Sequence, residues 1–297
     1  MQPLTDGSLP AFFIAADEAS SRAQRTALAS NRIRLIAAVI ASIGGVFSLV
    51  MWSVDVWALV ALVFFIVALS AELFIAIERP ERFWYQARAA AESTKTLSWR
   101  YAVGADPFFR SMPTTEADRL FRARVGQVAK QVSGAVDIPT GDASSPTPEM
   151  KLLRDSSLEN RRERYLADRT EAQRDWYTRK AASNRLWARG WRTFLISAEL
   201  VAVVLAAGRL FAGWTVDLAG VLAAIIGAGA AWLALKQHVT LRAAYSLTAA
   251  EIEKQIPSLL AASEEEWPVS VADAEDAISR EHTMWLASRG EVNEDIG

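Results

Sequence analysis

Trp52-Ser53-Val54-Asp55 separates two long apolar runs of this chain, and Trp214-Thr215-Val216-Asp217 separates two more. The two tetrapeptides lie 162 residues apart (214 minus 52). The apolar segments around them, residues 35–77 and 193–235, are equal in length. This repeat predicts two related hairpins, each of which turns at its Trp-(Ser/Thr)-Val-Asp sequence.

Each hairpin contains two runs that are long enough, or nearly so, to cross a bilayer. A helix needs about 20 apolar residues to span the hydrocarbon core. The four runs are residues 35–54, 56–77, 193–208 and 218–235. Glu72 interrupts the second run and Glu199 the third, and the third reaches full length only if Arg209 extends its charge toward the interface. We therefore predict an all-α integral membrane protein with four transmembrane helices.

The charges that flank the runs predict their orientation. Arginine and lysine cluster at the ends remote from the two turns, and the turns themselves hold only Asp55, Arg209 and Asp217. Positively charged loops are retained in the cytoplasm. We expect both termini and the long middle segment to be cytoplasmic. The two hairpins then point the same way and form a parallel repeat, whereas many secondary transporters have inverted repeats.

The composition excludes several classes of site. The 297 residues include no cysteine, and the two histidines, His238 and His282, are 44 positions apart. Neither a disulfide framework nor a zinc-hydrolase motif is therefore possible. The chain also has no phosphate-binding glycine loop and no nucleophile elbow. We predict no enzymatic activity, no metal site and no cofactor.

The regions outside the hairpins are polar, and their sequence patterns predict helices. We expect five helices outside the spans, over 82–101, 114–132, 157–192, 239–255 and 271–288. The helix over 82–101 should break near Gly104, and the helix over 239–255 should end before Pro257. Ser111, Thr114 or Thr115 could cap the helix over 114–132. The helix over 157–192 has no proline and should continue directly into the third span. Strand patterns are nearly absent. We divide the chain into a first domain (1–132), a linker (133–154) and a second domain (155–297).

Four acidic residues in the hairpins are candidates for pore lining or gating. Glu72 and Glu199 lie at a similar depth, and rings of such carboxylates in an oligomer favour cations. The alternative is that each one pairs with a nearby arginine or bonds between helices. Asp55 and Asp217 are placed to cap the helices that follow them. The alternative for these two is an acidic outer mouth that attracts cations.

The helix ahead of the third span combines arginines with aromatic residues. Residues 78–192 carry 22 Lys/Arg and 15 Asp/Glu, whereas residues 236–297 carry 5 and 12. Guanidinium groups bind phosphate and aromatic rings stack on bases, so this helix is a candidate nucleotide or oligonucleotide site. The same charges also fit topology, anionic lipid and pairing within the helix, and the acidic tail is a second candidate partner. The candidate residues are Arg161, Arg162, Arg164, Arg169, Arg174, Trp176, Tyr177 and Lys180.

Several motifs resemble the SLATT family of two-helix transmembrane effector domains. In the first half they are Ala91-Glu92, Lys95, Trp99-Arg100-Tyr101 and Asp106-Pro107-Phe108. In the second half they are Arg174-Asp175-Trp176-Tyr177, Lys180-Ala181 and the tail Val271–Glu275, Ile278–His282 and Trp285, which are similar to a SLATT subfamily related to the DUF4231 domain. The resemblance covers roughly residues 10–132 and 155–290.

The resemblance implies a bacterial inner-membrane effector of anti-phage defence. It implies pore formation when a nucleotide signal or stress is sensed, and a partner nucleotidyltransferase or nucleotide-sensing protein encoded nearby. We expect the gate to respond to a nucleotide or oligonucleotide signal or to a partner protein. Because one four-helix protomer leaves little room for a water path, we expect a homo-oligomer in the bilayer, with a tetramer as our guess. The alternatives are a non-conducting scaffold that recruits a cytoplasmic partner and, less favoured by the parallel repeat, a small transporter.

Overall fold

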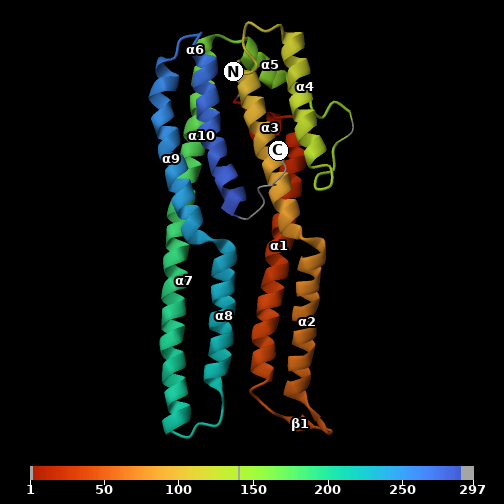
Figure 1. The fold of residues 1–297 in the computed structure, drawn as a ribbon, viewed down its shortest axis with the longest axis vertical. Coiled ribbons are helices and arrows are strands. Elements are labelled where there is room, and N and C mark those ends of the chain that lie inside the picture. Colours follow the sequence, from red (N-terminus) through yellow and green to blue (C-terminus); the bar gives the residue numbers. More distant parts are fainter. Residues whose placement is uncertain (1–2, 140, 289–297) are drawn as a thin grey trace. The chain divides into compact units, whose positions relative to one another are not determined.

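The computed structural model describes residues 3–139 and 141–288, with side chains as far as residue 279. Its described part is almost entirely helical (Figure 1). The elements are η1 (Asp6–Ser8), α1 (Ala11–Gly44), β1 (Val50–Met51), β2 (Val54–Asp55), α2 (Val56–Glu78), α3 (Pro80–Val103), α4 (Thr114–Gln131), α5 (Pro148–Asp155), α6 (Leu158–Arg164), the π-helix η2 (Tyr165–Glu171), α7 (Ala172–Phe211), α8 (Leu218–Lys236), α9 (His238–Ala261) and α10 (Trp267–Ser288).

The chain forms two compact units, and each takes residues from both halves of the sequence. The span unit comprises Gln24–Pro80 and Ala182–Arg242. The bundle unit comprises the described residues of Met1–Ala23, Glu81–Ala181 and Ala243–Gly297. The helices α1, α7 and α9 contribute residues to both units. The predicted division at 133–154 follows the order of the chain, whereas the compact units cut across it.

The span unit contains the four predicted transmembrane helices. Those long and apolar enough to cross a membrane are Ala11–Gly44, Val56–Glu78, Leu158–Phe211 and Leu218–Ala261. The first differs from the prediction, because its helix ends at Gly44 and not at Val54. The 20 residues that end at Gly44 begin at Arg25. A segment of bilayer length therefore includes Arg32 and Arg34, which the sequence analysis had placed outside the span.

Small residues let the helices of each hairpin approach closely. A Cβ added at Gly44 of α1 would lie 2.8 Å from the carbonyl oxygen of Trp57 in α2. In the second hairpin, a Cβ at Gly229 of α8 would lie 3.3 Å from Trp191 of α7. Glycine is required at Gly44 because the nearest atom is backbone and cannot move aside. The small size of Gly229 likewise allows α8 to lie close to α7.

The two hairpins turn in different ways. Trp52 and Ser53 both have positive φ, 54° and 71°, and join β1 to β2 in a two-residue antiparallel turn. Such turns match the twist of a strand pair. This short ladder was not predicted. At the second turn Trp214 folds back on α7, so that a Cβ at Gly208 would lie 2.7 Å from its ring.

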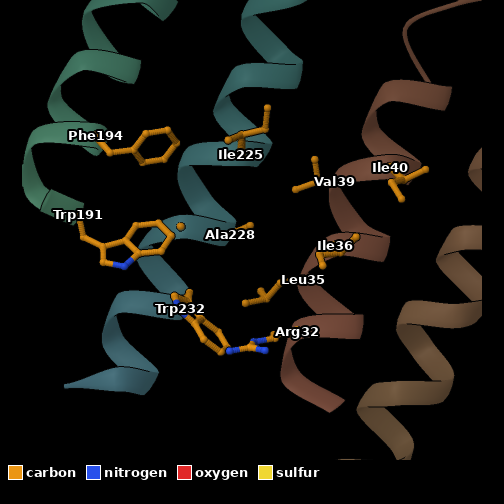
Figure 2. Close-up of a pocket in the computed structure, with 11 residues that line it drawn as sticks. Arg32, Leu35, Ile36, Val39, Ile40, Trp191, Phe194, Ile225, Ala228 and Trp232 are labelled. Carbon is orange, nitrogen blue, oxygen red and sulfur yellow. The ribbon is translucent and has the colours of Figure 1, made fainter. Parts of the chain in front are cut away.

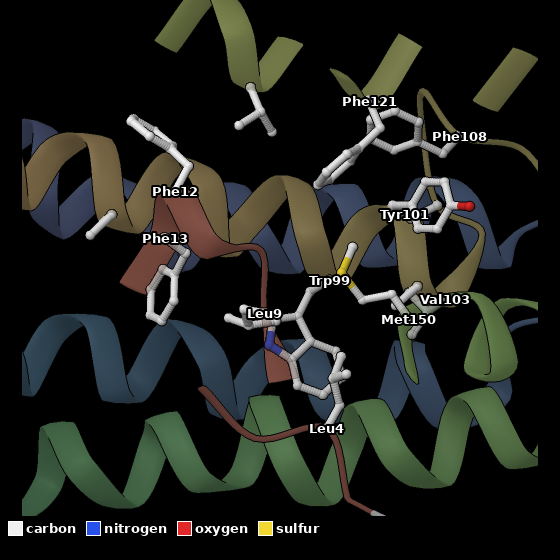
Figure 3. Packing of buried hydrophobic residues seen from close by; sticks show 14 of the residues in the cluster. Leu4, Leu9, Phe12, Phe13, Trp99, Tyr101, Val103, Phe108, Phe121 and Met150 are labelled. Atoms are coloured by element: carbon white, nitrogen blue, oxygen red, sulfur yellow. The ribbon is translucent and has the colours of Figure 1, made fainter. Parts of the chain in front are cut away.

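The bundle unit is built around aromatic residues from segments far apart in the sequence. Trp99 of α3 and Trp267 of α10 are buried, and both rings lie edge-on to Tyr165 at 5.9 Å. Figure 3 shows Leu9, Phe12 and Phe13 of the N-terminal segment in the same core as Trp99. Burial of side chains this large stabilises the fold by roughly 1.5–3 kcal/mol each, so this core is the main support of the bundle unit.

Several predicted helix boundaries need correction. α4 begins at Thr114 as expected, but its N-cap is Pro113 and no side chain caps it. α9 continues through Pro257 to Ala261, and does not end before the proline. The segment expected as a linker contains α5, in which Met150, Leu153 and Arg154 are buried. The long helix ahead of the third span is continuous as predicted, and includes a π-helical stretch that was not.

Candidate functional site

Glu72 is paired with an arginine of the neighbouring helix. Arg34 Nη1 of α1 lies 2.5 Å from Glu72 Oε2 of α2, and both side chains are partly exposed. A carboxylate inside a span costs about 2.5–3.5 kcal/mol on insertion scales, and a cationic partner reduces that cost. The pairing alternative of the sequence analysis thus describes Glu72 within one protomer.

Glu199 has no such partner. Its side chain is exposed on α7 and makes no hydrogen bond or ion pair with any residue of the described part of the chain. The apolar residues Ile196, Leu200 and Val203 are exposed on the same helix. The two carboxylates, which the sequence presents as equivalent, therefore have different surroundings.

Asp55 and Asp217 cap helices, as predicted. Asp55 Oδ1 accepts hydrogen bonds from the backbone N–H groups of Trp57 and Ala58 at 3.0 and 3.3 Å, and Oδ2 accepts one from the Ser48 hydroxyl at 2.5 Å. Asp217 accepts from the Gly220 N–H at 3.1 Å and lies 2.8 Å from Arg209. These bonds satisfy amide groups at the start of α2 and α8. Because both acids serve the turns, their role at a pore mouth stays a prediction.

Arg169, a candidate ligand residue, lies in the interior of the bundle unit. Its side chain is 1 % exposed and bonds Glu275, which is 0 % exposed, at 2.9 and 2.7 Å. The Tyr165 hydroxyl and the Thr96 hydroxyl donate to the same carboxylate at 3.0 and 2.9 Å. This network joins α3, η2 and α10. Arg169 is thus committed to the fold of the bundle unit.

Arg161 and Arg162 are held by groups at the junction before α10. Arg161 is buried, donates to the Val103 carbonyl at 2.9 Å and lies 2.5 Å from Glu264. Arg162 donates to the Ala262 carbonyl and lies over the Trp267 ring. With Arg169–Glu275, these contacts show that part of the acidic tail docks on the basic helix, which was one of the predicted alternatives.

Of the remaining candidates, Arg164, Arg174, Trp176 and Lys180 keep some exposed surface on the bundle unit, whereas Tyr177 is buried, in contrast to the accessible ligand contact that the sequence predicts. Arg174 lies 2.8 Å from Glu253 and 2.9 Å from Asp175, and its hydrogen bonds to these two carboxylates raise the pKa of the guanidinium group. Trp176, Tyr177 and Tyr245 form a cluster of rings whose centroids are 5.0–5.6 Å apart. Lys180 lies over the Trp176 ring at 5.4 Å, and Arg164 lies 3.9 Å from Asp168. These residues come together, but their binding of a ligand stays a prediction.

Two buried charged groups, Glu275 and Arg154, are not predicted from the sequence. Glu275 lies in the tail motif, yet nothing in its spacing reveals that it is buried. Arg154 is 1 % exposed and donates to the carbonyls of Phe108 and Phe109, both at 2.7 Å, from within the expected linker. Its only sequence signal is its position four residues after Met150, a spacing that places the two side chains on the same face of a helix.

One acid of the bundle unit is held in its charged form. Burial raises the pKa of Asp118, but hydrogen bonds from Lys151, at 2.7 Å, and from the Tyr101 hydroxyl outweigh it and lower the pKa below its usual 3.8. Burial, and then the bond to Asp118, raises the pKa of Tyr101. Both groups therefore keep their ordinary charge at neutral pH and act as structural links between α3, α4 and α5.

The described helices and their apolar runs are those of a helical membrane protein with four spans in two repeated hairpins. Residues 10–162 match the family model of SMODS and SLOG-associating 2TM effector domain 3, and residues 165–285 match that of domain 1. The chain therefore belongs to the SLATT family and carries two of its domains. A search of curated proteins and a search of solved structures each found no match. The junction between the two matched regions, at 162–165, coincides with the start of the π-helix η2.

Proposed function

We propose that this protein is an oligomeric pore-forming ion channel of the bacterial inner membrane and acts as an effector of anti-phage defence. The observation that carries the proposal is Glu199, an exposed carboxylate without a partner on the apolar surface of α7. If the Glu199 carboxylate faced lipid, its charge would raise the free energy of membrane insertion by about 2.5–3.5 kcal/mol. Facing a water-filled lumen shared by several copies, it remains hydrated, and a ring of such carboxylates favours cations.

The proposed assembly is a closed homo-oligomer, with four subunits as the working number. Glu72 is the weaker candidate for the lumen because Arg34 offsets its charge. The family supports the coarser statement, since SLATT domains are two-span membrane effector domains. The termini are placed in the cytoplasm on the basis of the flanking positive charges.

For gating, we propose that a nucleotide or oligonucleotide from a partner nucleotidyltransferase, or a protein partner, acts on the bundle unit. The continuous helix from Leu158 to Phe211 runs from the bundle unit into the third span. Its π-helical stretch is a rare form that is often found at functional sites. A ligand that changes this stretch would alter the rotation or tilt of α7. Arg164, Arg174 and Lys180 are the candidates with exposed surface for such a ligand.

The test is the current through planar bilayers that contain the full chain, recorded with and without cyclic and linear oligonucleotides. Discrete cation-selective currents are expected. Glu199→Lys should shift the reversal potential toward anion selectivity, whereas Glu116→Lys, an equal charge change on exposed α4, should not. Currents with unchanged selectivity in Glu199→Lys contradict the pore role of Glu199. Silence from a well-folded oligomer contradicts the channel and favours a membrane scaffold.

A further inference from the structure

An apolar groove opens on the surface of the span unit between the two hairpins. It has a volume of about 340 Å³ and is lined by α1, α7 and α8 (Figure 2). Its walls include Ile36, Val39, Phe194, Ile225 and Ala228. From Arg32 to Ile40 the α1 wall runs eight residues, or about 12 Å at the helical rise. An occupant of this groove must therefore be apolar over about that length.

One end of the groove is cationic. The Arg32 guanidinium lies 5.0 Å from the centre of the Trp232 ring, and the Lys236 ammonium lies 5.7 Å from the same ring. Arg32 makes no ion pair with any residue of the described part of the chain, and no acidic side chain lines the groove. The α1 helix thus carries two arginines two residues apart, of which Arg34 is neutralised by Glu72 and Arg32 is not. The charge at this end lacks an anion.

We propose that the groove binds an anionic phospholipid, with one acyl chain along the apolar wall and the phosphate on Arg32. The guanidinium group presents a planar set of donors that matches phosphate. Basic pockets between transmembrane helices are typical sites for anionic headgroups. Tryptophan, here Trp191 and Trp232, is enriched at the level of the headgroups. The site needs no pore and no particular orientation of the chain, so it stands apart from the proposed channel function.

The occupant is a lipid and not a second copy of the chain, because the groove is complementary to an anion that is joined directly to a long apolar chain. A free phosphate fills only the cationic end. A second copy would have to place a helix with bulky side chains into a space of about 340 Å³. A phospholipid has the anion and the slender apolar chain in one molecule.

The experiment is native mass spectrometry of the full chain in detergent, delipidated and then incubated with phosphatidylglycerol or phosphatidylcholine of identical chains. The wild-type chain is expected to retain phosphatidylglycerol preferentially. Arg32→Gln should reduce that preference about fivefold, the effect of one cation on an anionic headgroup. Arg25→Gln, which removes an arginine of the same helix outside the groove, should keep it.

A second pair of variants tests the apolar wall. Ala228→Leu narrows the groove and should lower retention of both lipids severalfold, whereas Ala230→Leu adds the same volume at an exposed position of α8 and should leave retention unchanged. Equal retention of the two lipids by the wild-type chain overturns the proposal. So does an Arg32→Gln variant with unchanged lipid preference, or one that changes the mass of the oligomer without changing its lipid content.

Discussion

The bundle unit and the span unit place their charged groups in opposite ways. In the bundle unit the pair Arg169–Glu275 is fully buried and each carboxylate oxygen is bonded. In the span unit the carboxylates of Glu72 and Glu199 are exposed, and one of them has no partner. Water solvates a surface charge cheaply, but lipid does not. An exposed charged side chain is therefore ordinary in the bundle unit, but in the span unit it needs a partner or water to offset the cost of facing lipid.

The two units therefore differ in whether their charged side chains have partners within the chain. The bundle unit satisfies its strongest charges internally, and its acidic tail and basic helix are already joined by Arg161–Glu264 and Arg169–Glu275. The span unit leaves Glu199 and Arg32 without counter-charges among the described residues. Such charged groups can be stabilised by a second copy of the chain, by water in a pore or by an anionic lipid.

The largest expected effect is in the bundle unit. Arg169→Met leaves Glu275 buried without its cation and should lower the free energy of unfolding by about 3–5 kcal/mol. The double variant Arg169→Met/Glu275→Leu should recover most of this loss, because it removes both charges. Thermal unfolding of the full chain in detergent measures both. Additive losses in the double variant would mean that the pair acts as packing and not as an ion pair.

The next effect tests the paired carboxylate of the span unit. Arg34→Leu leaves Glu72 alone in the span and should cost about 3 kcal/mol. Adding Glu72→Leu should restore stability, and Arg25→Leu serves as the control. The measurement is the midpoint of unfolding in a titration with sodium dodecyl sulfate. If Arg34→Leu is no less stable than Arg25→Leu, Glu72 does not depend on Arg34 for stabilisation. The proposed difference between the paired Glu72 and the unpaired Glu199 is then wrong.

Glu199 should behave differently from Glu72 in the same titration. Because Glu199 has no partner in the described part of the chain, Glu199→Leu should leave the unfolding free energy within about 0.5 kcal/mol of wild type. Glu72→Leu should cost more, since it strands Arg34. In bilayer recordings the order should reverse, with Glu199→Leu losing cation preference and Glu72→Leu keeping more of it. A loss of stability in Glu199→Leu would reveal a contact within the protomer.

The smallest effect concerns Asp118. Burial raises the pKa of its carboxyl group, but hydrogen bonds from Lys151 and Tyr101 lower it by more. A lowered carboxyl pKa stabilises the fold above the unfolded value of 3.8, and this contribution is lost as the pH falls below it. Asp118→Asn should therefore be less stable than wild type at pH 7, and the difference should shrink between about pH 4 and pH 2. Melting curves across this range check the sign; a difference that grows on acidification contradicts it.

Much of the fold follows from local patterns. Apolar runs of bilayer length, capping aspartates and a proline-free helix each act within a few residues, so the four spans, the caps Asp55 and Asp217 and the long helix into α7 were predictable. The end of α1 at Gly44 was not, because Val46–Val54 is as apolar as the helix before it. Close contact with α2 and the strand turn decide that boundary.

The repeat and the four spans follow from composition and spacing along the chain, and the family follows from the resemblance of its motifs to SLATT domains. The partners of the charged side chains, in contrast, are known only from the folded structure. Glu72 and Glu199 look alike in sequence, but Arg34 reaches one and nothing described reaches the other. Arg161 and Arg169 look like ligand residues, but acids about 100 positions away hold them. Such pairings depend on distances across the fold, and a linear sequence does not contain those distances explicitly.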